Sequence, residues 1–293
     1  MKMVRFKRVV RPVAVAFGVA ALAAACTTNS APLYRIPDQA GINFRWSAEP
    51  GLGLTTDPAI VARAFMESAF ISYGSLGIDS DRPEPTRYSY PGYKEAYPHF
   101  GSHEMVIGGV TMGIFSPGVT RTVGTFYAHL LELRTDESAQ PQADPPEWRA
   151  VMCVWVDALD VVYKPSNAAT VTKSPDGDRY SPILNIGSGP YGSGSGRTVR
   201  LTLQQPPAGH PTRLSSGEGP ARYPTSNVFG EWKVTDANMT DSDADGGVLG
   251  LGQPNICADR PDNPVPPNLR NRDYKSESDT PAPTLDQYPG WPA

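Results

Sequence analysis

The chain has 293 residues, enough for one large domain or two small ones, and its 30 Asp and Glu outnumber its 26 Lys and Arg. Nucleic acids and anionic lipid headgroups require a basic surface, so this acidic balance argues against both as partners. Gly and Pro together contribute 59 residues, about a fifth of the chain, which predicts long loops and excludes a fold dominated by helices.

A basic and then apolar stretch opens the chain. Residues 1–12 contain five Lys and Arg and no acidic residue. They are followed by Val13–Ala25, an apolar run of 13 residues that ends directly before Cys26. This is the plan of a secretory signal peptide over residues 1–25. A retained membrane-spanning helix is the less favoured interpretation, because such a helix needs about 20 apolar residues.

Residues 22–26, Leu-Ala-Ala-Ala-Cys, resemble the lipobox of bacterial lipoproteins. The resemblance implies that the signal peptide is cut off before Cys26 and that lipid is joined to the Cys26 thiol. Each buried methylene of an acyl chain contributes about 0.8 kcal/mol, so the lipid would tether the domain to the outer face of the cell membrane or envelope. Ala23 and Ala25 also permit cleavage without lipid, which would leave the protein freely secreted.

The mature chain would keep 268 residues and carry a net charge of −9, because all five basic residues of the leader are removed. Residues 26–56 are predicted to be a lipid-attached linker followed by a docked segment. Within it Phe44 and Trp46 alternate with Arg45, which predicts a short strand. A hydrophobic latch is the alternative.

The strongest helix signal covers Asp57–Gly74. Asp57 suits the N-cap and Gly74 the C-terminal stop, and apolar residues recur at three- and four-residue steps between them. Arg63 and Glu67 fall on the other side of this predicted helix. We therefore expect the helix to lie with its apolar face on a sheet.

Alternating and apolar runs predict strands over most of the remaining chain. These are Met105–Ile114, Thr120–Arg134, Arg149–Tyr163, Thr198–Leu203 and Val228–Val234, together with a hairpin at Asp176-Gly177 whose arms are Thr170–Lys173 and Tyr180–Ile186. In Thr120–Arg134 both faces are apolar, because Phe126 and Leu130 interrupt the polar side. A helix over Thr125–Leu133 is the alternative there.

One helix followed by antiparallel strands predicts an α+β fold over residues 57–253, with the N-terminal helix packed on a curved antiparallel sheet and long Pro- and Gly-rich loops. The order of elements resembles NTF2-like and cystatin-like folds, in which a curved sheet wraps around a helix. Residues 254–293 are rich in Pro and charge with few apolar residues, which predicts an extended C-terminal tail.

Three cysteines are present in the chain. If lipid takes Cys26, Cys153 and Cys257 remain as an even pair in an oxidising compartment, and we predict a disulfide between them. Two separate buried thiols are the alternative.

An acidic segment gives the most specific indication of a metal site. Asp241, Asp243 and Asp245 precede Gly246, which matches the first half of a calcium loop, because alternate residues direct oxygens inward and glycine allows the sharp turn. Gly252 stands where the second half needs a bidentate Glu. Calcium is therefore the one cofactor that the sequence indicates, and a solvated acidic loop is the alternative.

Histidines and tyrosines gather in a second candidate segment. Tyr90, Tyr93 and Tyr97 lead to His99 and His103, whose four-residue spacing would place both imidazoles on one face of a helix, as in zinc sites. Tyrosines on loops also form binding surfaces. The alternatives are a polar loop for the histidines and a small local core for the tyrosines.

The sequence contains no strong catalytic motif. No G-x-S-x-G elbow occurs, and the G-x-G-x-x-G letters at residues 187–192 are followed by more Gly and Ser in place of a helix. The sequence therefore predicts a non-enzymatic envelope lipoprotein that binds or scaffolds an envelope protein or a small ligand. The alternative is an envelope hydrolase that uses a metal at His99, His103 or the Asp241–Asp245 cluster.

Overall fold

The computed structural model describes residues 41–74, 89–98, 119–135, 145–163, 179–182, 196–208, 217–240, 255–257, 259–270, 272 and 278–292. All of them belong to one compact unit, Leu33–Ala293. The signal peptide, Cys26, the predicted strand Met105–Ile114, and residues 170–173 and 187–192 lie outside the described residues.

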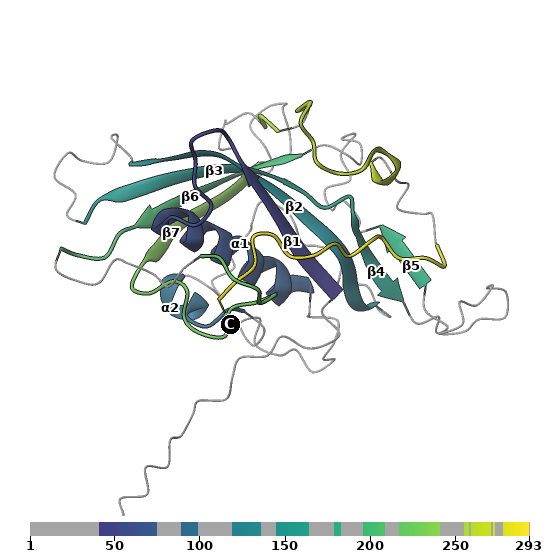
Figure 1. Ribbon diagram of the computed structural model, residues 1–293, viewed down its shortest axis with the longest axis horizontal. Helices are drawn as coiled ribbons and strands as arrows, with labels where there is room; N and C mark the ends of the chain where they lie inside the picture. Colours follow the sequence, from purple (N-terminus) through teal and green to yellow (C-terminus); the bar gives the residue numbers. More distant parts are fainter. Residues whose placement is uncertain are drawn as a thin grey trace, which may run out of the picture. The chain divides into compact units, whose positions relative to one another are not determined.

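The described elements follow one another along the chain as strands with two helices near the start. They are β1 Gly41–Ala48, α1 Asp57–Gly74, α2 Tyr93–Ala96, β2 Val119–Thr135, β3 Glu147–Trp155, β4 Leu159–Tyr163, β5 Arg179–Pro182, β6 Arg197–Gln204, β7 Lys233–Thr240 and a 3₁₀ turn at Pro267–Leu269 (Figure 1). The fold is therefore mixed α/β with few helices among the described residues, in agreement with the predicted class.

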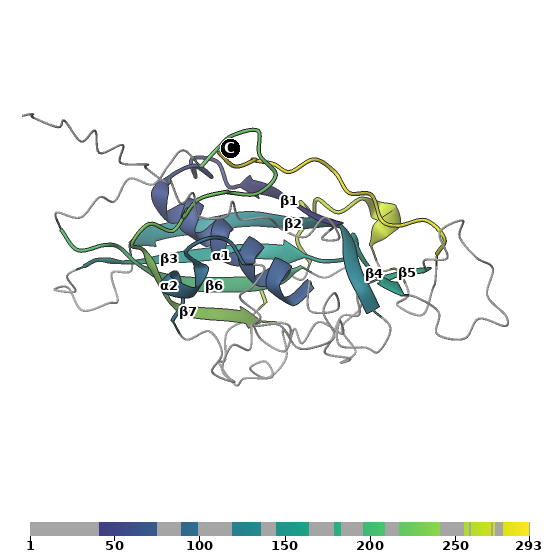
Figure 2. The ribbon, with the colours of Figure 1, turned by 90° about the horizontal axis from the view of Figure 1, so that it is seen from below.

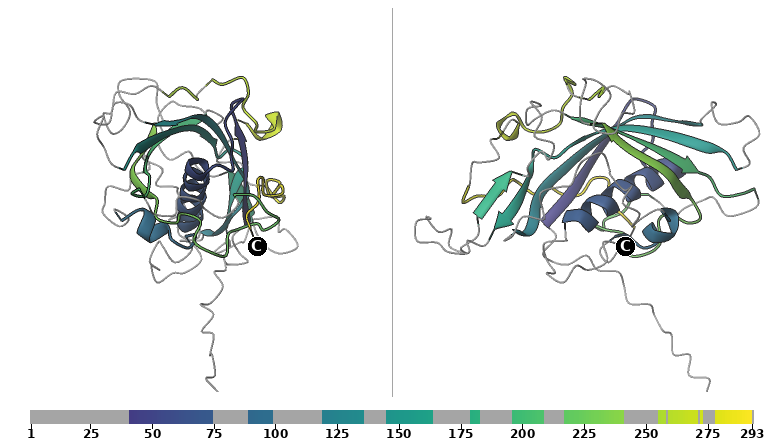
Figure 3. Two further views of the ribbon diagram at one scale, coloured as in Figure 1. Left: turned by 60° about the vertical axis from the view of Figure 1, so that its left-hand side comes forward. Right: turned by 180° about the vertical axis from the view of Figure 1, so that it is seen from behind.

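The sheet is built around β2, its longest strand. One edge of β2 pairs with β4 and then β3, and the other edge pairs in parallel with β1. The sheet path is β5-β4-β2-β3-β6-β7, and every pairing except β1–β2 is antiparallel. The strands curl into a half-barrel, and the left view of Figure 3 shows α1 inside the curve.

The concave side of the sheet holds the main core. From α1, Phe65, Phe70 and Ile71 are fully or almost fully buried, and the ring of Phe70 lies 4.2 Å from the ring of Phe126 on β2. Phe44 of β1 packs on the same Phe126 ring. Figure 2 shows α1 and α2 lying across β3, β6 and β7. The outer face of the sheet, which faces away from α1, carries a second cluster around Tyr127, Cys153 and Trp155.

Two alternatives left open by the sequence are resolved at β1 and β2. Phe44 and Trp46 lie in a strand, so the latch interpretation is wrong. Residues 125–133 also lie in a strand, with Phe126 and Leu130 in the main core and Tyr127 in the outer cluster, so the helix interpretation is wrong. A strand buried on both faces loses its polar alternation, which is why the sequence pattern was ambiguous.

The predicted strand Arg149–Tyr163 is wrong as a single strand, because the chain kinks between β3 and β4. Val156–Ala158 face only two residues of β2, which is the arrangement of a β-bulge. Gly124 permits the kink: its φ is +119°, and a Cβ atom there would overlap the carbonyl oxygen of Ala158. The bend turns β4 and β5 away from the direction of β3.

One other strand prediction needs correction. The last strand begins at Lys233, because Val228 and Phe229 belong to a buried turn in which Trp232 donates a backbone hydrogen bond to Phe229. The described part of the predicted arm Tyr180–Ile186 belongs to β5, Arg179–Pro182, which pairs with β4, and its predicted partner arm, residues 170–173, lies outside the described residues. Period-two alternation indicates a strand but carries no information about its partner.

The C-terminal strap, residues 278–292, packs along the sheet. The Tyr288 amide donates to the Phe44 carbonyl (2.9 Å) and the Trp46 amide donates to the Tyr288 carbonyl (2.7 Å), so the strap pairs with the free edge of β1. Ser278 pairs likewise with Tyr180 of β5. Trp291 is fully buried. The expectation of a tail apart from the domain is therefore wrong for these residues, because paired sheet edges and a buried ring hold them in place.

Candidate functional site

The structure brings together only some of the residues that the sequence predicts for a site. Cys26, His99, His103 and the cluster Asp241, Asp243 and Asp245 lie outside the described residues. The predicted calcium loop and histidine pair therefore stay predictions.

The three tyrosines of the predicted binding loop are core residues. Tyr90, Tyr93 and Tyr97 are all buried, and the rings of Tyr93 and Tyr97 lie within 5.6 Å and 5.2 Å of the ring of Phe65. They cannot offer an exposed binding surface, so that prediction is wrong for them. The alternative that they cover a local core is correct, and that core is the main one beneath α1.

Tyr90 also belongs to a buried polar network around Glu67. Four side chains donate to the Glu67 carboxylate: Tyr90 (2.5 Å), Trp46 (2.8 Å), Trp291 (2.8 Å) and Gln287 (3.2 Å). Burial raises the pKa of Glu67, although the charge of Arg63 and the donated hydrogen bonds oppose the rise.

Arg63 is equally buried and donates to backbone carbonyls of Leu54, Gly217 and Pro289. Arg63 and Glu67 lie on the side of α1 opposite its apolar face, yet both are buried, because the strap and the loop at Gly217 cover that side of the helix. Their partners come from the chain itself and satisfy buried charges, so this network explains the packing of the strap rather than a ligand site.

The predicted disulfide is present. The Cys153–Cys257 bond is 2.04 Å long, and both cysteines are fully buried against the outer face of the sheet. Asn255 and Thr198 support the bridge: the Thr198 hydroxyl donates to Asn255 Oδ1, and the Ile256 amide donates to the Thr198 hydroxyl. The bridge fastens the segment formed by residues 255–257 and 259–270, here called the Cys257 segment, onto the sheet.

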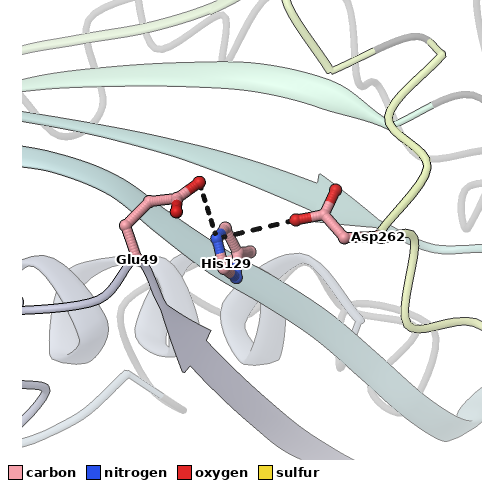
Figure 4. Close-up of side chains that lie close together, drawn as sticks. All are labelled: Glu49, His129 and Asp262. Carbon is pink, nitrogen blue, oxygen red and sulfur yellow. Dashed lines mark ion pairs between the residues drawn. The ribbon is translucent and has the colours of Figure 1, made fainter.

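This attachment creates a three-residue polar group (Figure 4). Glu49 follows β1 directly, His129 lies on the outer face of β2, and Asp262 belongs to the Cys257 segment. His129 pairs in the sheet with Cys153, so the disulfide brings the chain around Asp262 to the imidazole. His129 Nε2 lies 3.4 Å from Glu49 Oε1 and 3.9 Å from Asp262 Oδ2.

Two further side chains complete the group. Ser47 Oγ lies 2.7 Å from His129 Nδ1, which orients the imidazole. Arg260 donates to Glu49 Oε1 (2.8 Å) and to Asp262 Oδ2 (2.7 Å). These hydrogen bonds from Arg260 are the main reason that the pKa values of Glu49 and Asp262 are lowered, and they raise the pKa of Arg260.

Glu49, His129 and Asp262 can each offer one ligand atom to a metal, and these atoms lie within 4.8 Å of one another. Sequence reasoning missed the group because its members are separated by 80 and more residues and no local spacing connects them. The only available signal was a histidine among the apolar residues of a strand, which more often belongs to a core.

Comparisons with known proteins add no further information: no family model matches the chain, and no curated protein or solved structure is significantly similar to it. Within the part of the chain that the structure describes, no helix has both the length and the apolar character needed to cross a membrane.

Proposed function

We propose that the chain is a bacterial lipoprotein of the cell envelope. Its leader, residues 1–25, is removed, lipid on Cys26 holds it at the outer face of the membrane, and the folded unit binds or scaffolds another envelope protein or a small ligand. The observation that carries this proposal is the Cys153–Cys257 disulfide. Disulfides persist in oxidising compartments, and this one leaves Cys26 as the odd cysteine, directly after an apolar leader.

Three large apolar side chains on the outer segments are exposed, and a bound partner would cover them. Tyr288 and Leu285 of the strap are 54% and 41% exposed, and Ile256 of the Cys257 segment is 48% exposed. The acidic mature chain also fits a domain that stands off a negatively charged membrane surface.

We also propose the finer architecture that the sequence predicts for the whole unit. In it α1 is the long N-terminal helix packed on the curved sheet, with the four-residue α2 beside it, and long Pro- and Gly-rich loops connect the strands. Residues 254–293 form a largely extended C-terminal tail, although its described part is docked on the sheet and includes the 3₁₀ turn Pro267–Leu269.

Intact mass spectrometry of the protein extracted from its native membrane tests the anchor. We expect a chain that begins at Cys26, carries acyl groups on that residue and lacks two hydrogens because of the disulfide. A Cys26→Ser variant is the control and should lose the acyl mass. A chain that retains residues 1–25 with an unmodified Cys26 would contradict the proposal.

Native mass spectrometry of the same detergent extract tests the binding role. We expect a defined additional mass, either one protein or one small ligand, in a fixed ratio to the chain. A monomer without any bound mass would contradict the binding role.

The group Glu49, His129 and Asp262 favours a second candidate, a metal-dependent envelope hydrolase, because one histidine and two carboxylates can hold a catalytic metal. Hydrolysis of model esters or phosphoesters by the purified protein, abolished in His129→Ala, would favour this candidate. Activity that persists in His129→Ala would exclude this group as its site.

A further inference from the structure

We propose that Glu49, His129 and Asp262 form a binding site for a divalent transition metal of the Zn²⁺ type. The inference does not rest on the lipid anchor or on the binding role. It places a metal where three distant parts of the chain meet: the end of β1, the outer face of β2 and the Cys257 segment.

The donor set selects the class of metal. One imidazole nitrogen and two carboxylate oxygens suit zinc and related transition metals, whereas calcium prefers six to eight oxygen ligands. Three protein ligands leave a fourth position of a tetrahedral site open to water or a substrate.

The spacing of the ligand atoms fits a tetrahedral ion. Zinc–ligand bonds of 2.0–2.2 Å place neighbouring ligand atoms of a tetrahedron about 3.3–3.6 Å apart. The distance between His129 Nε2 and Glu49 Oε1 is 3.4 Å, which lies within this range, and that between Nε2 and Asp262 Oδ2 is 3.9 Å. All three ligand atoms lie within 4.8 Å of one another, so the Asp262 side chain must move inward to complete the geometry.

The imidazole of His129 is oriented as a ligand. Its side chain is 12% exposed, and its Nε2 atom is inaccessible to solvent and lies within ion-pair distance of both carboxylates, without a well-aligned hydrogen bond to either. When Nδ1 carries the proton and donates to Ser47 Oγ, the lone pair of Nε2 faces two carboxylates. Electron pairs on three sides repel one another unless a cation lies among them, and an outer hydrogen bond at Nδ1 is the usual support of a metal-binding histidine.

Arg260 currently supplies positive charge to both carboxylates, donating to the same oxygens that lie nearest His129. Two carboxylates and one guanidinium still leave a net charge of −1, which attracts a cation. A divalent metal at the site would be repelled by the guanidinium, so we expect Arg260 to compete with the metal and to limit its affinity.

Isothermal titration calorimetry with Zn²⁺ tests the site, using the full protein purified in detergent and stripped of metal by a chelator. We expect one ion to bind per chain. His129→Ala should weaken binding by at least 10- to 100-fold, since even changes in outer-shell partners of metal ligands have effects of this size. Glu132→Gln, a partly exposed carboxylate elsewhere on β2, is the matched control and should leave the affinity unchanged.

Arg260→Ala keeps the test decisive even if a ligand variant folds poorly, because we expect it to bind Zn²⁺ more tightly, by on the order of tenfold. A destabilised protein cannot gain affinity in this way. The proposal is overturned if neither the wild type nor Arg260→Ala binds one ion, or if binding survives in His129→Ala, since the ion would then lie elsewhere in the chain.

Discussion

Replacing Trp291 tests whether the C-terminal strap is part of the core. The indole is fully buried, its Nε1 donates to the buried Glu67 carboxylate at 2.8 Å, and the Arg63 guanidinium lies 4.4 Å from the ring centre. Trp→Ala at a fully buried site lowers the free energy of unfolding by about 3–5 kcal/mol, because it leaves a cavity. We expect Trp291→Ala to reach this range.

Trp291→Phe separates the hydrogen bond from the packing, because it keeps an aromatic ring and removes the N–H donor. A hydrogen bond to a charged group contributes about 1.5–3 kcal/mol, so we expect this variant to lose less stability than Trp291→Ala. Trp148→Ala is the matched control. Trp148 is only partly buried, and its Nε1 donates to the amide of Gln205, so we expect a smaller loss there.

Urea unfolding followed by far-UV circular dichroism measures these differences, since tryptophan fluorescence would itself change with the substitutions. Equal m-values would show that the denatured states are comparable. A loss below about 1 kcal/mol for Trp291→Ala, or one no larger than for Trp148→Ala, would refute the inclusion of the strap in the core.

Three further predictions follow from the structure. Replacing Cys153 and Cys257 together with Ala should lower the free energy of unfolding by about 2–5 kcal/mol in urea titrations under oxidising conditions, because the bridge joins residues 104 positions apart; an unchanged midpoint would contradict this. Gly124→Ala should lower the thermal midpoint far more than Gly51→Ala, since both glycines have positive φ but only at Gly124 does a Cβ meet backbone; equal shifts would contradict this reasoning. Burial raises the pKa of Glu67 above 4.5, so the folded chain holds that proton more tightly than the unfolded chain, and stability from this group falls as pH rises through the interval between the two pKa values. The free energy of unfolding of the wild type minus that of Glu67→Gln should therefore be smaller at pH 7.5 than at pH 4.5. If this difference instead grows with pH, the pKa of Glu67 is lowered in the folded chain.

Metal removal provides another check on the Cys257 segment. If the metal proposed at Glu49, His129 and Asp262 is bound, chelation should lower the thermal midpoint of the wild type and leave that of His129→Ala unchanged, because only the folded site binds the ion. Differential scanning calorimetry with and without chelator measures the shift. An equal response of both variants would place the stabilising ion elsewhere.

Local elements of this fold could be read from short-range patterns. The helix Asp57–Gly74 has the bounds that capping residues and apolar spacing predict, and β6 lies within one residue of its predicted range at each end. The two cysteines of the bridge followed from their number and the expected compartment, not from their positions. In each case the information lies within one segment or in the composition of the chain.

The candidate metal group, Glu49, His129 and Asp262, could not be predicted from the sequence. In the sequence, His129 is one residue of a mainly apolar strand, and nothing near Glu49 or Asp262 distinguishes them from ordinary surface carboxylates. They meet because β1 pairs in parallel with β2 and because the disulfide brings the Cys257 segment to the outer face. Strand pairing and chain docking depend on contacts between distant residues, and periodicity within a segment does not specify them.

The sequence by itself determined the place of the long helix and most strand-forming stretches, since these depend on neighbours a few residues apart. Only the tertiary structure decided that Arg63 and Glu67 are buried, that the chain kinks between β3 and β4 opposite Gly124, and that the C-terminal strap closes the edge of β1. The physical reason is that burial and edge pairing are properties of the whole packed unit. A charged residue on a helix becomes a core residue only when another part of the chain covers it and supplies its hydrogen-bond partners.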